Sequence, residues 1–173
     1  MSGATGSLAA QPETRSWARL LLLLAAIIEF LSGLGALPIL AGDLNEVPGP
    51  GLGGAIILAT IILHPIAAGA ALLFLLRGQL PWALVAMALV ILLNWVAYLP
   101  SVQLHGMDVE SDPTGGLVVF LILILPPILV LAVSGLALMN TRLTLATLLA
   151  IIPTLIGVLS VVAFAIGVAI YGF

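Results

Sequence analysis

Residues 21–38 read LLLLAAIIEFLSGLGALP, and Glu29 is the only charged side chain in this apolar stretch. The surrounding apolar run extends over about residues 18–41. About 20 consecutive apolar residues are enough for a helix to cross the hydrocarbon core of a bilayer. Further runs of this kind lie at about 54–76, 81–99, 117–139 and 144–172. The sequence therefore predicts an all-α integral membrane protein, a bundle of five transmembrane helices.

The composition supports this fold class. The chain has 173 residues, of which 63% are hydrophobic and 6% charged, whereas about a quarter of the residues are charged in an ordinary soluble domain. We expect residues 1–16 to form a flexible cytoplasmic tail and residues 17–173 a single bundle without a soluble domain. The absence of cysteine excludes thiolate chemistry. The absence of a basic run argues against nucleic acid as a partner.

The arginines predict the orientation. Arg15 and Arg19 precede the first apolar run, Arg77 follows the second, and Arg142 follows the fourth. Alternate connections of a bundle lie on the same side of the membrane, so all four arginines share one side. By the positive-inside rule this side is cytoplasmic, which places the N-terminus inside and the C-terminus outside. The composition, rich in Ala, Leu and Gly, favours a bacterial cytoplasmic (inner) membrane.

Glu29 lies about 15 Å along its helix, close to the middle of the bilayer. Positions at helical spacing around it are small: Ala25, Ala26, Gly33 and Ala36. Small side chains allow close approach of another helix, so we expect the carboxylate to face the bundle.

Three other polar residues are expected in the same membrane layer as Glu29: His64, Asn94 and Ser160. His64 lies at the depth of Glu29 in the neighbouring run, which predicts a contact between the two, direct or through water. Intramembrane ionisable groups are candidate functional sites, but polar contacts between helices also serve packing. The layer is therefore read either as a packing network or as a site for a proton or a small ligand.

The connection between the third and fourth runs has an acidic surface. Asp108, Glu110 and Asp112 could offer oxygens to a hard cation, although a solvated acidic loop is the ordinary reading. A haem held by two histidines is disfavoured, because His105 is expected outside the membrane; a single-histidine site shared with another subunit stays open. The sequence identifies neither a metal site nor any other cofactor.

No catalytic motif is present in the sequence. The first functional hypothesis is a non-enzymatic accessory or structural subunit, packed against membrane lipids and other membrane-protein subunits or a second copy of itself. The alternative is a small proton-coupled transporter or permeation protein that uses Glu29 and His64; an enzyme acting on lipid or quinone is a third reading. The first hypothesis rests on small-residue stripes, among them a ridge in the last run formed by Ala146, Ala150, Pro153, Gly157, Phe164 and Gly167.

Overall fold

The computed structural model describes residues 13–42, 51–105 and 120–172, and every element in these ranges is helical. The long α-helices are joined by two short elements, a 3-10 turn (η1) after α1 and a π-helical turn (η2) before α5. The elements are α1 (Glu13–Ala36), η1 (Leu37–Ala41), α2 (Gly51–Leu76), α3 (Leu80–His105), η2 (Phe120–Ile124), α5 (Leu125–Leu138) and α6 (Leu143–Tyr171). The predicted all-α fold class is confirmed.

Four helical segments are long and apolar enough to cross a membrane: Ser16–Ala41, Gly51–Leu76, Leu80–Pro100 and Leu143–Tyr171. The fourth predicted run, 117–139, differs from the prediction. Its described part contains a shorter apolar helix, Ile122–Leu138, while residues 117–119 lie outside the described ranges. Pro126 and Pro127 explain the break, because proline lacks the N–H that continues an α-helix and is accommodated best in its first turn. The proline pair accordingly stands at the start of α5, directly after the π-helical turn.

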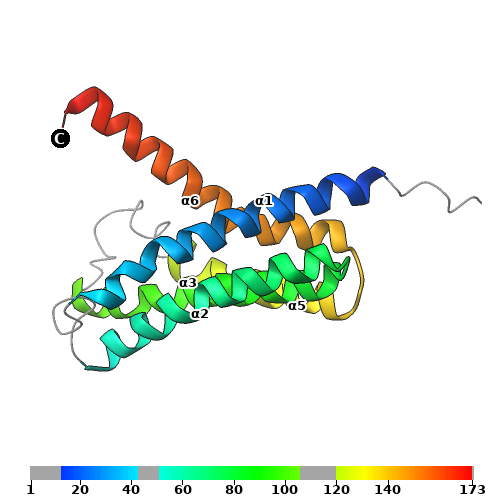
Figure 1. Ribbon diagram of the computed structural model, residues 1–173, viewed down its shortest axis with the longest axis horizontal. Helices are drawn as coiled ribbons and strands as arrows, with labels where there is room; N and C mark the ends of the chain where they lie inside the picture. Colours follow the sequence, from blue (N-terminus) through cyan, green and yellow to red (C-terminus); the bar gives the residue numbers. More distant parts are fainter. Residues whose placement is uncertain (1–12, 43–50, 106–119, 173) are drawn as a thin grey trace, which may run out of the picture.

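Successive helices run in alternate directions, so that the start of α1, the α2–α3 turn and the α5–α6 turn share one end of the bundle (Figure 1). Both turns use the same helix ending. After α2, Gly78 has φ +74°, and the amides of Gly78 and Gln79 bond to the carbonyls of Leu75 and Phe74. This is a Schellman motif, which needs a residue with positive φ after the helix.

Asn140 supplies the positive φ after α5. Its φ is +52°, and the amides of Asn140 and Thr141 bond to the carbonyls of Ala137 and Leu136. Asparagine tolerates the left-handed conformation better than most side chains. Both turns are therefore tight, and α2 packs directly on α3 as α5 packs on α6.

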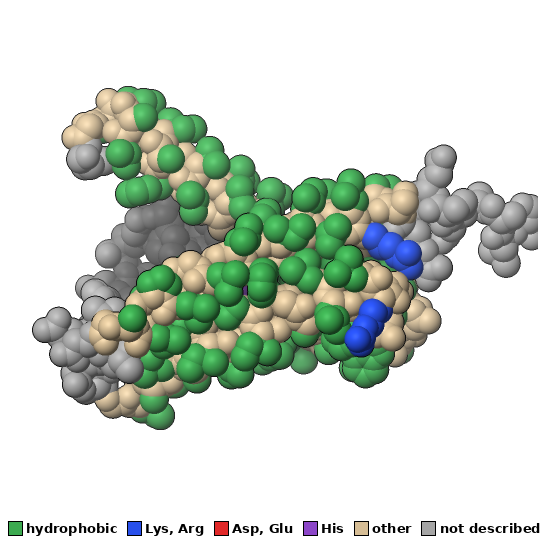
Figure 2. All heavy atoms as spheres, in the orientation of Figure 1, with side chains coloured by type: hydrophobic (Ala, Val, Ile, Leu, Met, Phe, Trp, Pro, Cys, Tyr) green, Lys and Arg blue, Asp and Glu red, His purple; other side chains and the backbone are tan. Residues whose placement is uncertain are grey.

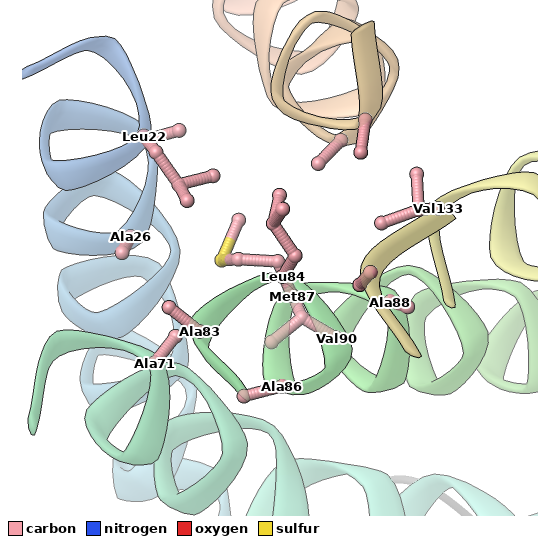
Figure 3. Close-up of a cluster of buried hydrophobic side chains, with 14 of the residues drawn as sticks. Leu22, Ala26, Ala71, Ala83, Leu84, Ala86, Met87, Ala88, Val90 and Val133 are labelled. Carbon is pink, nitrogen blue, oxygen red and sulfur yellow. The ribbon is translucent and has the colours of Figure 1, made fainter. Parts of the chain in front are cut away.

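The core lies around α3, which packs against α2, α5 and α6. Figure 3 shows Leu84 and Met87 of α3 filling the space between the helices, with the Met87 sulfur directed toward α1 and Val133 approaching from α5. Much of the remaining core is alanine, which brings backbones close together. Its alanines, all buried, include Ala26, Ala71, Ala83, Ala86 and Ala88.

The two halves of α6 differ. Its first half packs against α1, α3 and α5 and buries Ala146, Thr147, Ala150 and Thr154. Beyond Thr154, no residue of 155–171 is buried. Figure 1 shows this second half, the outer half of α6, projecting away from the other helices. The bundle therefore holds α6 only up to Thr154.

Candidate functional site

Glu29 of α1 is buried, with 8% of its surface exposed, and both of its carboxylate oxygens have partners. The Thr154 hydroxyl of α6 donates to Oε1 over 2.6 Å. Oε2 lies 3.0 Å from Nε2 of His64 on α2, and it accepts a hydrogen bond from Nδ2 of Asn94 on α3 over 3.4 Å. One carboxylate thus connects four helices. We call Glu29, His64, Asn94 and Thr154 the buried polar cluster; Asn94 is half-buried and the other three side chains are buried.

Gly33 brings α2 close enough for the contact between His64 and Glu29. A Cβ at Gly33 would lie 3.0 Å from both the ring Cδ and the nitrogen of Pro65, and 3.1 Å from Nδ1 of His64. These distances are shorter than ordinary van der Waals contacts, so a side chain here would push the helices apart. Gly33 follows Glu29 by one helical turn and lies on the same face of α1. Gly33, a member of the small-residue stripe, thus allows His64 to contact the Glu29 carboxylate.

The protonation of the pair follows from hydrogen-bond chemistry. An ionised carboxylate only accepts hydrogen bonds, so with Glu29 ionised the His64 ring carries a proton on Nε2. A proton passed from His64 to Glu29 would travel along the same 3.0 Å contact. The two residues are therefore placed both to bind each other and to exchange a proton.

Ser160, expected in this layer, is not part of the cluster. Its hydroxyl donates to the carbonyl of Ile156 in its own helix over 2.9 Å, and the side chain is exposed. Ser160 lies six residues beyond Thr154, or about 9 Å along the helix axis at 1.5 Å per residue. By that point α6 has left the bundle, so Thr154 supplies the hydroxyl instead. Reasoning from the sequence missed Thr154, since Ser160 lies closer than Thr154 to the middle of the last apolar run, residues 144–172.

A second polar contact lies beside the cluster. The indole N–H of Trp95, next to Asn94 on α3, donates to the carbonyl of Leu123 over 3.2 Å. In an unbroken α-helix this carbonyl would accept from residue 127, but Pro127 has no N–H. Trp95 therefore supplies a donor to a carbonyl that cannot accept an α-helical hydrogen bond from Pro127. The sequence analysis did not anticipate this role.

No fully buried polar atom of the cluster lacks a hydrogen-bond partner. Within residues 13–42, 51–105 and 120–172, no buried side-chain nitrogen or oxygen lacks a partner. The same ranges hold no group of three or more His, Asp or Glu side chains arranged to bind a metal ion. The predicted acidic loop site, Asp108, Glu110 and Asp112, lies outside the described residues. The arrangement can thus fasten four helices together or hold and move a proton.

Comparison with protein-family models, with curated proteins and with solved structures finds no match for this chain.

Proposed function

We propose that this chain is a non-enzymatic accessory subunit that crosses a bacterial cytoplasmic membrane five times and packs against a different membrane protein. The N-terminus is cytoplasmic and the C-terminus outside. The observation that carries the proposal is the outer half of α6, an apolar helical segment of residues 155–171 in which the described part of the chain buries no residue. The partner is a transmembrane helix of another subunit, seated on this segment.

Two glycines favour a helix rather than lipid alone as the neighbour of this segment. A Cβ added at Gly157 or Gly167 would meet nothing within 4 Å. Glycine inside a helix costs about 1 kcal/mol relative to alanine, and no described part of the chain uses the space that these glycines leave. Small residues at membrane interfaces let two helix backbones approach closely. Ala146 and Ala150, the other end of the predicted ridge, are buried within the bundle instead.

The buried polar cluster supports the same function. Glu29 accepts a hydrogen bond from the last buried residue of α6, Thr154, while its other oxygen contacts α2 and α3. The hydrogen bond from Thr154 holds α6 at the point where its outer half leaves the bundle. A rigid base lowers the conformational entropy lost when a partner binds.

Photo-crosslinking in native membranes tests the proposal. We compare a benzophenone side chain at Val161 on the outer half of α6 with one at Leu131 on α5; these side chains are 68% and 73% exposed. We expect a discrete adduct with a different protein from position 161, none from position 131, and loss of the adduct in Gly157→Leu. Because Cβ space at Gly157 is open, Gly157→Leu should leave thermal unfolding of the chain unchanged.

Three results would overturn the accessory function. One is lipid adducts alone from position 161. Another is an adduct that persists in Gly157→Leu. The third is an adduct of twice the chain mass, which would assign the segment to a homo-oligomer.

The orientation is tested separately. The chain has no cysteine, so each single-cysteine variant carries one reactive thiol and no other site in the chain is labelled. With a membrane-impermeant maleimide on spheroplasts, we expect labelling of Tyr171→Cys and protection of Gln79→Cys until the membrane is permeabilised. Both side chains are exposed. The reverse pattern would contradict a cytoplasmic N-terminus.

A second candidate function, proton-coupled transport, is favoured by the buried contact between Glu29 and His64. Two titratable groups in contact near mid-membrane are typical of proton relays. Proteoliposomes containing the chain would then show proton-linked flux that Glu29→Gln and His64→Ala abolish. Unchanged flux in both variants would rule out the relay, and the crosslinking result does not depend on it.

A further inference from the structure

A groove of about 270 Å³ lies between α1 and α2 at the end of the bundle where α1 begins. Four of its residues come from one face of α1, because positions 16, 19, 20 and 23 recur at helical spacing. The other two are the last residues of α2. The lining residues are Ser16, Arg19, Leu20, Leu23, Leu75 and Leu76.

The polar and apolar parts of this groove are separated along α1. Ser16 and Arg19 lie nearer the end of the bundle, and Leu23 lies one turn further in than Arg19. Leu75 and Leu76, the last residues of α2, lie at the same end of the bundle as Arg19, and Leu20 and Leu23 continue the apolar lining inward along α1. A cation beside a lining of leucines matches an amphiphile with an anionic headgroup and a hydrocarbon chain. On α1, where Arg19 precedes Leu23 by about one turn, the order of side chains matches a phospholipid that lies parallel to this helix.

The charge at this end favours an anionic headgroup. Among the described side chains, no carboxylate lies within ion-pair distance of Arg19. The one contact of this kind among them joins His64 and Glu29, and it is an ion pair when His64 is protonated. Figure 2 shows arginine side chains at the end of the molecule where α1 begins, and no acidic side chain of the described residues on that face. Arginine binds phosphate oxygens through its planar fork of N–H donors.

Two exposed tryptophans mark the level of the headgroups. Trp17 adjoins Ser16 on α1, and Trp82 lies in the first turn of α3 at the same end of the bundle. Tryptophan is enriched at the boundary between hydrocarbon and water in membranes. Arg19 is half a turn from Trp17, so its guanidinium can reach the phosphate layer while its stem stays along the leucines.

We propose that the groove between α1 and α2 is a binding site for one phospholipid with an anionic headgroup. Its phosphate contacts Arg19, and one acyl chain lies against Leu20, Leu23 and Leu75. The proposal rests on the proposed membrane insertion, but it is independent of any partner on α6. The ligand is a lipid phosphate rather than free phosphate, because the leucines would contact nothing on an inorganic ion.

Native mass spectrometry of the full chain in detergent tests this site, with phosphatidylglycerol as the probe and phosphatidylcholine and inorganic phosphate as comparisons. We expect one saturable phosphatidylglycerol adduct. Arg19→Gln should weaken it about fivefold, the factor expected for one arginine at a membrane surface. Arg142→Gln, which removes an arginine at the same end but outside the groove, should leave it unchanged.

A second variant fills the groove without changing its charge. Leu23→Trp should displace the acyl chain and lower phosphatidylglycerol binding while Arg19 is intact. Circular dichroism and thermal unfolding report whether each variant is folded. Four results would each overturn the proposal. Phosphatidylcholine or inorganic phosphate could bind as tightly as phosphatidylglycerol, Arg142→Gln could weaken phosphatidylglycerol binding as much as Arg19→Gln, or folded Leu23→Trp could bind phosphatidylglycerol as tightly as the unchanged chain. Resistance of the chain to carbonate extraction from membranes, measured alongside, separates failure of this site from failure of membrane insertion.

Discussion

Thr154 and Glu29 are 125 positions apart in the chain, yet the Thr154 hydroxyl donates to Glu29 Oε1 over 2.6 Å. This contact joins α6 to α1 at the residue beyond which α6 is no longer buried. It is the shortest hydrogen bond within the buried polar cluster. The position of the last helix is therefore linked to the only buried carboxylate among the described residues.

Thr154→Val tests this contact, because valine keeps the shape of threonine and removes the hydroxyl. Glu29 Oε1 would lose its donor, and we expect a destabilisation of about 1–2 kcal/mol, within the range for a polar contact between membrane helices or a lost buried hydrogen bond. The measurement is thermal unfolding in detergent. Thr60→Val is the matched control, since the Thr60 hydroxyl donates to Ile56 within its own helix. Equal effects of the two substitutions would contradict a special role for Thr154.

Gly33→Ala tests the close approach of α1 and α2. The added methyl would lie 3.0 Å from Pro65 and 3.1 Å from His64 Nδ1. Such overpacking costs about 1–3 kcal/mol, and we expect a lower midpoint of thermal unfolding. Gly35→Ala provides the control two residues away, because nothing lies within 4 Å of a Cβ there. There the substitution should be neutral or stabilise the helix by about 0.5–1 kcal/mol. A Gly33→Ala variant as stable as Gly35→Ala would argue against the tight contact.

A double-mutant cycle of Glu29→Gln and His64→Ala tests whether the pair acts as a unit. Residues in direct contact show coupling energies of about 0.5–3 kcal/mol, whereas distant residues are additive within about 0.5 kcal/mol. We expect coupling for this pair in the free energy of unfolding. Glu29→Gln combined with Thr60→Val should be additive, because the Thr60 hydroxyl bonds elsewhere. Additivity in both cycles would mean that the 3.0 Å contact contributes no specific interaction.

The long helices could be predicted because membrane spans leave a simple pattern of apolar length, and the seating of Glu29 followed from helical spacing. Ala25, Ala26 and Gly33 are all buried on the same face as Glu29, as their positions one turn apart indicate. These features depend on residues close together in the chain. The contact of Glu29 with His64 required only the depth of the two residues along neighbouring helices, and Asn94 was expected in the same layer without a specified contact.

The features that the sequence did not predict depend on the path of a helix in three dimensions. Counting depth along the last run assumed that α6 stays in the bundle, and this assumption placed Ser160 in the polar layer in place of Thr154. The fourth run was expected as a single span because its apolar length hides a change of helix type. Pro126 and Pro127 are visible in the sequence, but apolar length alone does not show that a π-helical turn precedes them.

Trp95 and Pro127 provide the last test. Trp95→Phe removes the donor to the Leu123 carbonyl, and we expect a loss of about 1 kcal/mol in unfolding free energy, typical of one hydrogen bond. Pro127→Ala restores a backbone N–H that can reach the same carbonyl, so in the double variant Trp95→Phe should cost less than it does alone. Trp82→Phe is the control, because Trp82 is exposed at the end of the bundle. If Trp95→Phe costs the same with Pro127 and with alanine at this position, the indole does not substitute for the missing backbone donor.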